Sequence, residues 1–401
     1  MRKLVWVAAG ACMLSNVAHA QSAVTLYGIV DNGIGYQSSG TTLGSTSGGH
    51  SIVKMTTGVY AADRLGFKGS EDLGGQTQAI FQLEEGFNAA NGAEATSGLA
   101  FSRVAYVGLT NPAYGTLSAG REYSTYYTFL QPFSPEPKVT GFYGAHPGDI
   151  DAMDTDYHVN NAIVYTSPNF HGLTLGGTYA LAGVAGSLNT GSSWSFGAQY
   201  LNGPIGVAAA FWRINNSTPG GGAFGAASAV SNNGAQIGVS AVNVGYQTAQ
   251  AQQRFAVAGG YTFSPAWDVS VTYSNVQYIP GAGSMFANTA IFNTGGAVLH
   301  FKPSVVWDLA AAYAYTRATS ANGISAPAQY HQVNFSEVYS LSKRTAVYAV
   351  EGWQRALGQT LGINGAGDIV NTVASAGDGA NSMPGSSRNQ IVAGVGLMHK
   401  F

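Results

Sequence analysis

The final twelve residues alternate in character, and this alternation constrains the fold more than any other feature. Ile391, Ala393, Val395, Leu397, His399 and Phe401 share one parity, and Gln390, Val392, Gly394, Gly396, Met398 and Lys400 share the other. Because strand side chains point alternately to opposite faces, this stretch predicts a β-strand with one apolar face. It ends on Phe401, and aromatic side chains are favoured at a membrane–water boundary. We therefore expect a closed barrel that this strand seals.

The composition agrees with a membrane barrel. Only 9% of residues are charged, against roughly 25% in soluble domains. Mean hydropathy is nevertheless only +0.06, and no run after the first residues reaches the ~18 apolar residues of a membrane helix. Gly (55), Tyr (22) and Phe (18) are abundant. Barrel strands dilute their apolar residues one in two, which explains this combination. The alternative is a soluble, secreted all-β protein.

Residues 1–20 have the pattern of an export signal. Arg2 and Lys3 precede an apolar stretch, and Ala18-His19-Ala20 is a small-x-small cleavage site, so the mature chain is expected to begin at Gln21. The single cysteine lies in this segment, which leaves no disulfide or thiolate chemistry. Without Arg2 and Lys3, the 17 basic residues become 15 against 19 acidic ones. This balance argues against nucleic-acid binding.

Turn residues divide residues 21–401 into strands in one repeated rhythm. Seven short turns are expected, at Ser70–Gly75, Asn111–Gly115, Ser167–Gly172, Leu201–Pro204, Phe263–Trp267, Lys302–Trp307 and Leu341–Thr345. They join fourteen strands in pairs, and the first and last strands bring the total to sixteen. The expected fold is therefore all-β: a 16-stranded antiparallel transmembrane β-barrel with short turns on one rim and long loops on the other. Residues 217–253 could instead hide an extra hairpin at Ile237–Tyr246, which would give eighteen strands.

Four segments carry a resemblance to a known family: Val24–Asp31, Arg64–Gly75, Leu341–Thr345 and Val395–Phe401. In combination they resemble the general porins of beta-proteobacteria, over about residues 22–401. The resemblance implies a homotrimer of barrels in the outer membrane, with short turns in the periplasm, a water-filled pore in each barrel, and a third loop that folds inward. The expected partners are outer membrane lipid and lipopolysaccharide, the barrel assembly machinery, which would read Val395, Leu397, His399 and Phe401 as an assembly signal, and small hydrophilic solutes.

The third loop, at about residues 122–158, is the first candidate for a functional element. It carries the acids Glu136, Asp149, Asp151, Asp154 and Asp156. A loop of this length would ordinarily be a solvated surface loop. Its seven Tyr and Phe residues between Tyr123 and Tyr143 are too many for that reading, and the resemblance also places the loop inside the barrel.

Basic residues on the barrel wall are expected to face this loop. Arg64 and Lys68 lie opposite Leu65 and Phe67 in parity, and Arg103 lies opposite Val104 and Tyr106, so all three should point into the lumen. A charge facing lipid near the midplane would cost about 2–4 kcal/mol.

The family resemblance refines these assignments. Arg64 and Arg103 match two wall arginines at the constriction, whereas a third family arginine falls near His158, which puts strong anion selectivity in doubt. Arg121 shares the parity of Leu117 and Ala119, so it is expected at a subunit interface, paired with an acid such as Glu94 of a neighbour. For all of these residues the alternative is a structural salt bridge or a solvated wall residue.

These features predict a physical mechanism rather than a chemical one. Acids on the loop and bases on the wall would create a transverse field across a narrow aqueous gap, which favours hydrophilic solutes. The predicted function is passive diffusion of ions and small hydrophilic solutes, and the alternative is a channel specific for a sugar or organic anion. An enzyme is disfavoured because the histidines are dispersed and no G-x-S-x-G occurs. An adhesin is disfavoured because no plug segment precedes the first strand. No cofactor or metal is expected.

Overall fold

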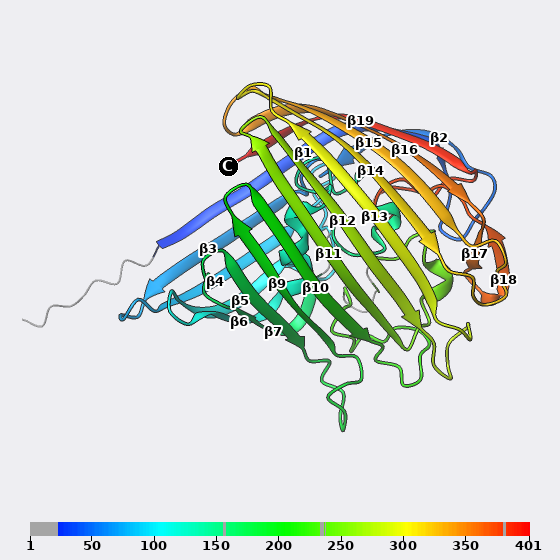
Figure 1. Ribbon diagram of the computed structural model, residues 1–401, viewed down its shortest axis with the longest axis horizontal. Coiled ribbons are helices and arrows are strands. Elements are labelled where there is room, and N and C mark those ends of the chain that lie inside the picture. Colours follow the sequence, from blue (N-terminus) through cyan, green and yellow to red (C-terminus); the bar gives the residue numbers. More distant parts are fainter. Residues whose placement is uncertain (1–22, 155–157, 233–235, 237, 380–381) are drawn as a thin grey trace, which may run out of the picture.

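One sheet curls and closes on itself to form a β-barrel (Figure 1). The computed structural model describes residues 23–154, 158–232, 236, 238–379 and 382–401. The strands are β1 (Ala23–Gly40), β2 (His50–Thr57), β3 (Arg64–Asp72), β4 (Gln78–Gly86), β5 (Val104–Asn111), β6 (Gly115–Tyr123), β7 (His158–Thr166), β8 (Leu173–Ala180), β9 (Ser193–Asn202), β10 (Ile205–Asn215), β11 (Ala251–Ser264), β12 (Trp267–Ile279), β13 (Ala290–Phe301), β14 (Trp307–Ala318), β15 (Gln329–Ser340), β16 (Thr345–Leu357) and β19 (Asn389–Lys400).

These seventeen segments form sixteen barrel strands, because β2 and β3 are two parts of one strand. β2 pairs with the second half of β1, from Asn32 to Gly40, and β3 pairs with the first half, from Ala23 to Ile29. All pairings in the sheet are antiparallel, and each barrel strand pairs with its sequence neighbour. The expected strand number is confirmed.

The last strand closes the barrel as its alternation predicted. β19 pairs with β16 on one side and with β1 on the other, where Ile29 lies opposite Lys400. Phe401 and Gly28 then exchange two backbone hydrogen bonds, with N···O distances of 3.1 and 3.2 Å. The Phe401 ring lies against Gly28, where a Cβ would come within 2.3 Å of it. Closure leaves no open strand edge in the hydrocarbon.

The outer face of the barrel is apolar. In β19, Val395 and Leu397 are about half exposed, whereas Val392 and Met398 are buried. Aromatic side chains gather near the short turns, as in the stacked pair Trp267–Phe301 and the tilted pair Trp307–Tyr339. His399 is exposed at the same rim, and its Nδ1 lies 2.9 Å from Thr345 Oγ1. The expected directions of Val395, Leu397 and Phe401 are therefore confirmed.

The two rims differ as expected. All seven short turns occur at the expected positions, and longer loops join the strands at the opposite rim. The sequence did not reveal the small hairpin β17 (Gln359–Gly362) and β18 (Gly365–Asn371), which belongs to the last long loop. Between β10 and β11 the described residues contain the 3₁₀ turn η3 (Val244–Tyr246) and no additional strand, so the 16-strand alternative is correct there. Within the described residues, no helix has the length and apolar character needed to cross a bilayer.

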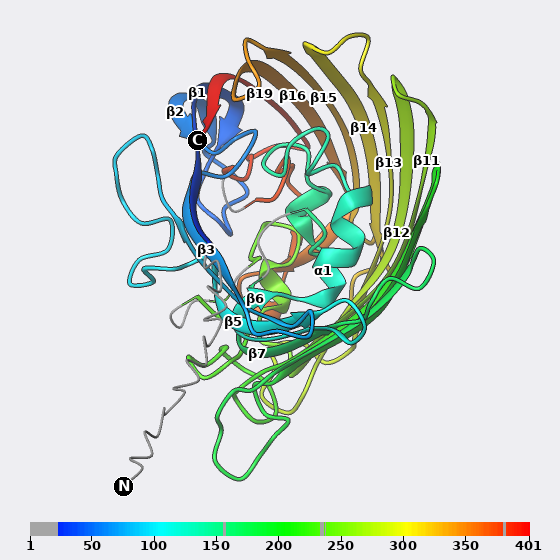
Figure 2. The same ribbon diagram turned by 90° about the vertical axis from the view of Figure 1, so that its left-hand side faces the viewer.

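The third loop folds into the barrel (Figure 2). It contains the helix α1 (Thr125–Leu130) and the 3₁₀ turns η1 (Gln131–Phe133) and η2 (Pro147–Asp149). The Ser124 hydroxyl accepts a hydrogen bond from the Tyr127 amide and so caps α1, and Pro132 follows closely after it. Tyr126, Leu130 and Phe133 are buried against the wall.

Small residues on the inner wall make room for this loop. A Cβ at Gly176 would lie 2.9 Å from the Phe129 ring, and a Cβ at Gly206 would lie 2.8 Å from the Phe133 ring. Ala208, Ala210, Ala256 and Ala258 contribute to the same buried cluster. The wall of β8–β11 is thus shaped to hold the loop aromatics, and the inward folding is confirmed.

A second inward segment interrupts the strand formed by β2 and β3. Residues 58–63 leave the ladder at Gly58, which has φ of +64°. The Asp31 carboxylate accepts hydrogen bonds from the Tyr60 and Ala61 amides and so fixes the bulge. Val59 is buried, and its carbonyl accepts a hydrogen bond from Thr140 of the third loop. The bulge and the loop therefore meet inside the barrel.

Candidate functional site

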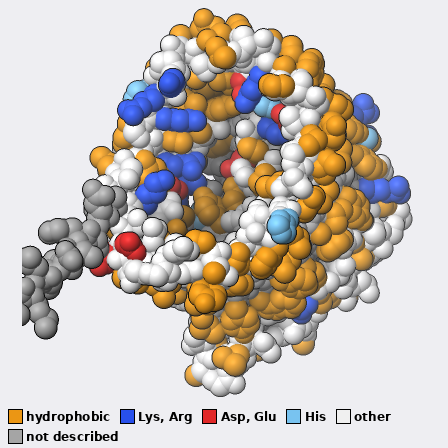
Figure 3. Space-filling view, turned by 60° about the vertical axis from the view of Figure 1, so that its left-hand side comes forward, with side chains coloured by type: hydrophobic (Ala, Val, Ile, Leu, Met, Phe, Trp, Pro, Cys, Tyr) orange, Lys and Arg blue, Asp and Glu red, His pale blue; other side chains and the backbone are white. Residues whose placement is uncertain are grey.

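A polar cavity of about 740 Å³ lies inside the barrel, between the wall, the bulge at 58–63 and the third loop. Figure 3 shows an opening in this face of the barrel, with basic and acidic side chains at and inside it. The charged residues that line the cavity are Arg64, Arg103, Arg121, Lys400, Asp63, Glu136, Asp149, Asp154 and Asp378, together with His158. Both signs of charge therefore face one aqueous space.

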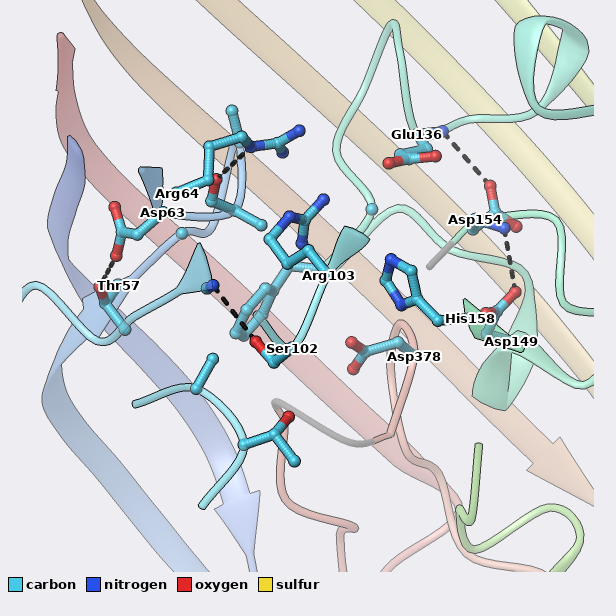
Figure 4. Close-up of a pocket in the computed structure, with 18 of the residues that line it drawn as sticks. Thr57, Asp63, Arg64, Ser102, Arg103, Glu136, Asp149, Asp154, His158 and Asp378 are labelled. Atoms are coloured by element: carbon cyan, nitrogen blue, oxygen red, sulfur yellow. Dashed lines mark hydrogen bonds between the residues drawn. The ribbon is translucent and has the colours of Figure 1, made fainter. Parts of the chain in front are cut away.

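Arg64 and Arg103 lie next to each other on the wall side of the cavity (Figure 4). Arg103 Nε donates to Glu84 Oε1 at 2.7 Å, and Arg64 Nη1 lies 4.0 Å from the same oxygen. Arg103 Nη2 also donates to the Tyr123 hydroxyl at 2.8 Å. The expectation that both arginines point into the lumen agrees with this placement, and Glu84 is a partner that the sequence reading did not name.

The parity argument for Arg103 was nevertheless wrong. Val104 is buried, and Tyr106 bonds to Gln82 on the inner wall, whereas Val107 and Leu109 are exposed on the outside. Val104 and Tyr106 therefore face inward rather than outward. Arg103 reaches the lumen because it precedes β5 and escapes the alternation of that strand.

The expected outward direction of Arg121 is also wrong. Leu117 is exposed on the outside as predicted, but the register of β6 against β7 shifts between Gly120 and Glu122. Gly120 has φ of +151°, which redirects the chain and turns Arg121 inward. Arg121 is buried, donates to the Ser102 carbonyl and to Asn160 and Asn232, and lines the cavity. Glu94 is exposed in the loop between β4 and β5.

Lys68 and His158 occupy different levels of the lumen. Lys68 lies in the middle of β3, with its ammonium 5.3 Å from the centre of the Tyr27 ring. It is not among the residues that line the cavity, contrary to its assignment to the constriction. His158 lines the cavity, and its ring lies 4.2 Å from the Tyr123 ring. The Tyr123 ring also stacks on the Tyr127 ring, so Tyr123, which accepts a hydrogen bond from Arg103, is held between two neighbouring rings.

Three of the predicted loop acids line the cavity across from the arginines: Glu136, Asp149 and Asp154 (Figure 4). Glu136 accepts a hydrogen bond from the Tyr127 hydroxyl at 2.6 Å. Asp149 accepts from the amides of Met153 and Asp154, which holds this turn of the loop. Asp156 lies outside the described residues.

Asp151 is buried away from the cavity, so its predicted place among the constriction acids is wrong. Its Oδ2 lies 2.9 Å from His146 Nδ1 and accepts a hydrogen bond from Ser274 at 2.6 Å. Burial by itself would lower the pKa of His146, but the carboxylates of Asp151 and Asp154 overcome burial and raise that pKa to about 9. The ion pair lies within the third loop, and the hydrogen bond from Ser274 to its Asp151 member fastens the loop to β12.

The same three side chains have the spacing of a metal site. His146, Asp151 and Asp154 present ligand atoms within 4.8 Å of one another. However, the His146 amide donates to Asp154 Oδ2 at 3.0 Å, and His146 Nδ1 is already bonded to Asp151. This bonding accounts for the cluster as a loop anchor.

The anchor predicts a pH dependence of stability. The folded-state pKa of His146 is about 9, above the ordinary value of 6.5, so its contribution is complete below pH 6.5 and is lost as pH rises through 9. The contribution is on the order of 3 kcal/mol. Thermal unfolding of wild type should show a falling midpoint between pH 7 and pH 10, and His146→Gln should flatten that slope. Equal slopes in the two proteins would exclude His146 as the cause.

Several residues that line the cavity, or that pair with its lining, were missed by the sequence analysis for different reasons. Glu84 shares the parity of Gln78 and Gln82, so its inward direction was readable from β4. Asp63 belongs to the bulge, and Asp378 belongs to the last long loop, where no periodic pattern exists. Asp378 is nearly fully buried, and its amide donates to the Phe142 carbonyl of the third loop at 3.0 Å. The third loop and the last long loop therefore both contribute carboxylates to the acidic side of the cavity.

Comparisons with known proteins place this geometry among channel proteins. A family model described as Gram-negative porin matches residues 6–358. An outer membrane porin protein of Bordetella pertussis is 33% identical over 240 residues, which cover 54% of this chain and 60% of that protein. The match therefore spans less than two thirds of that relative.

Solved structures show the same fold over nearly the whole chain. An anion-selective porin from Comamonas acidovorans superposes with a TM-score of 0.69 at 22% identity, and covers 95% of this chain and 100% of its own. OmpT, an outer membrane protein of Vibrio cholerae in a trimer form, superposes with a TM-score of 0.61 at 15% identity, and covers 95% and 99% respectively. At these identities the likeness concerns the fold alone.

Proposed function

This chain belongs to the Gram-negative porin family, and on that premise we propose that it forms a water-filled channel for passive diffusion of ions and small hydrophilic solutes across the outer membrane. The observation that carries the proposal is the cavity inside a closed barrel, lined by Arg64 and Arg103 on one side and by Glu136 and Asp154 on the other. A barrel of this size holds an aqueous lumen unless something fills it.

The opposed charges explain passage in physical terms. Basic and acidic groups on facing walls produce a field across the gap, in which water and dipolar solutes align. An apolar solute would have to displace that ordered water without replacing its hydrogen bonds, and so it is disfavoured. Because charges are screened over about 8 Å at physiological salt, the residues lining the cavity dominate this effect.

We propose that ion selectivity is moderate. Glu84 binds Arg103 directly and lies within 4.0 Å of Arg64, so it offsets part of their charge. The acids Asp63, Glu136, Asp149, Asp154 and Asp378 line the same space. His158 lines the cavity where the family resemblance implies a third arginine.

A homotrimer is the proposed assembly. The outward side chains of β1, β2, β5 and β6 are mostly aliphatic, among them Val24, Leu26, Ile34, Val53, Val107 and Leu117, whereas those of β11–β15 include many Tyr, Trp and Phe. Aromatic belts mark lipid contact, so the aliphatic side suits a neighbouring subunit. The loop that carries Glu94 reaches away from the barrel (Figure 2), and Glu94 is proposed to contact that neighbour.

Three further proposals concern export and surroundings. Residues 1–20 are proposed to be a cleaved signal that precedes the barrel domain from residue 21. Outer membrane lipid and lipopolysaccharide would surround the apolar belt, and the barrel assembly machinery would recognise β19. A catalytic role is not proposed, because the family to which the chain belongs consists of channels.

The solute-specific alternative has less support from the structure than from the sequence. It required the tyrosines of the third loop to line the path, but Tyr126, Tyr127 and Tyr143 are buried against the wall. Phe142 is the aromatic residue of that loop that lines the cavity, among the residues described. Tyr60 and Phe87 also line the cavity, so its aromatic rings come from three separate segments and not from a tyrosine track on the third loop.

Addition of neutral sugars during ion-current recording separates the two functions. Purified protein in a planar bilayer should pass current that mono- and disaccharides do not block saturably at millimolar concentration. A saturable block by one sugar would instead establish the specific channel. A sugar larger than the cavity serves as the control for nonspecific effects of viscosity.

A further inference from the structure

A groove lies on the outer surface of the barrel, at the long-loop end of β12–β14. Its volume is about 460 Å³, and its lining includes Tyr273, Asn293, Gly295, Tyr315 and Arg317. The floor is Gly295 of β13, where an added Cβ would meet nothing within 4 Å. The outward residue next toward the short turns is Ala297, which is also small and exposed. An elongated apolar chain therefore fits between the two tyrosines.

Hydrogen bonds hold the walls of this groove in place. The Tyr273 hydroxyl donates to Asn293 Oδ1 at 2.8 Å, and the Tyr315 hydroxyl donates to Gln329 Oε1 at 2.9 Å. Both partners lie toward the long-loop rim, so each ring extends along the barrel surface. The groove is thus a built feature of three neighbouring strands.

One cationic side chain, Arg317, lines the groove at its long-loop end, and a second, Arg355, lies two strands away on β16. Arg317 lies directly opposite Asn293 in the ladder, and Arg355 lies opposite His331 on the next two strands. Arg317 and Arg355 are exposed, and in the described part of the chain neither forms an ion pair or a side-chain hydrogen bond. The outward acids of β15 and β16, Glu337 and Glu351, lie farther toward the short turns.

The position along the strand matches a lipid headgroup. Trp307 marks the aromatic girdle near the short turns, and Arg317 lies ten residues farther along β14. At ~3.3 Å per residue and a tilt near 40°, this separation is about 25 Å, the height of the apolar band of such barrels. Tyr313 and Tyr315 then form the second girdle, and Arg317 lies just beyond it in the headgroup layer.

We propose that this groove is a binding site for a phosphorylated, acylated lipid of the outer leaflet. The acyl chain would lie over Gly295 and Ala297 between Tyr273 and Tyr315, and the phosphate would bind Arg317 and Arg355. Guanidinium groups bind phosphate through paired hydrogen bonds, and arginines near an anionic surface strengthen binding substantially. The site depends on the outer-membrane location of the protein and is independent of ion conduction.

Native mass spectrometry of the detergent-purified protein with diphosphorylated lipid A tests the site. Arg317→Ala with Arg355→Ala should weaken retention of this lipid about 25-fold, since each arginine contributes about five-fold. The matched control is Lys343→Ala with Arg344→Ala, which removes two exposed charges at the opposite rim and should leave retention unchanged.

A second variant separates the groove from the charges. In Gly295→Leu the new side chain extends into open space, so the barrel should form normally. The leucine would fill the groove and should weaken retention of the lipid about ten-fold. Single-channel conductance should remain at the wild-type value in both variants, which distinguishes failure of this site from failure of the channel. Equal retention by wild type and the double arginine variant would overturn the proposal, as would equal losses in the double arginine variant and the opposite-rim control.

Discussion

Replacement of Arg64 and Arg103 together by alanine is expected to shift the reversal potential toward cations under a salt gradient. Both side chains line the cavity, and their loss leaves Glu84 buried without its 2.7 Å partner. A unit charge 4 Å from a permeating ion contributes about 4 kcal/mol at an effective dielectric constant of 20, before screening. The cation-to-anion permeability ratio should therefore rise several-fold in planar-bilayer recordings.

A third substitution tests the origin of that shift. Glu84→Gln, added to the double variant, removes one negative charge against the two positive charges lost, so about half of the shift should disappear. It also removes a buried unpaired charge, which should recover any lost stability. A reversal potential that stays at the wild-type value in the double variant would mean that the two arginines are not at the constriction.

Deletion of Phe401 is expected to reduce the yield of folded trimer in the outer membrane several-fold. The deletion removes both backbone hydrogen bonds to Gly28 and uncovers the backbone of β1 at the seam. Unpaired backbone groups are costly in a bilayer. The folded yield is measured by running membrane fractions on gels with and without heating, because the folded trimer and the heat-denatured chain migrate differently.

Two companion variants sharpen this test. Phe401→Tyr keeps the ring and the backbone bonds, so it should assemble normally. Gly28→Val should reproduce the defect, because a Cβ there would lie 2.3 Å from the Phe401 ring and 2.7 Å from the Arg64 carbonyl. Normal trimer yield after deletion of Phe401 would refute the role of this contact.

Period-two alternation and turn residues were sufficient to predict the barrel. They placed the seven short turns, the strand count and the outward direction of Leu397 because each strand has one face in lipid. A one-residue slip would expose every inner side chain, so register is strongly specified. The inward folding of the third loop was predictable from its aromatics together with the family resemblance.

The errors arose where the backbone leaves that regular pattern. The register shift beside Gly120 turned Arg121 inward, and the strand break at Gly58 created a bulge that brings Asp63 to the cavity. Asp151 looked like its neighbours in sequence, but the position of His146 and Ser274 removed it from the lumen. Such features depend on contacts between distant segments, which local periodicity does not encode.

Recording from planar bilayers with the purified wild-type protein tests the central claim most directly. The structure and the proposed assembly predict stepwise, long-lived increases in current that occur in groups of three, with one pore in each barrel of a trimer. Heat-denatured protein at the same concentration is the control and should give no steps. Absence of steps from folded protein would contradict the account of this barrel as an open, water-filled channel.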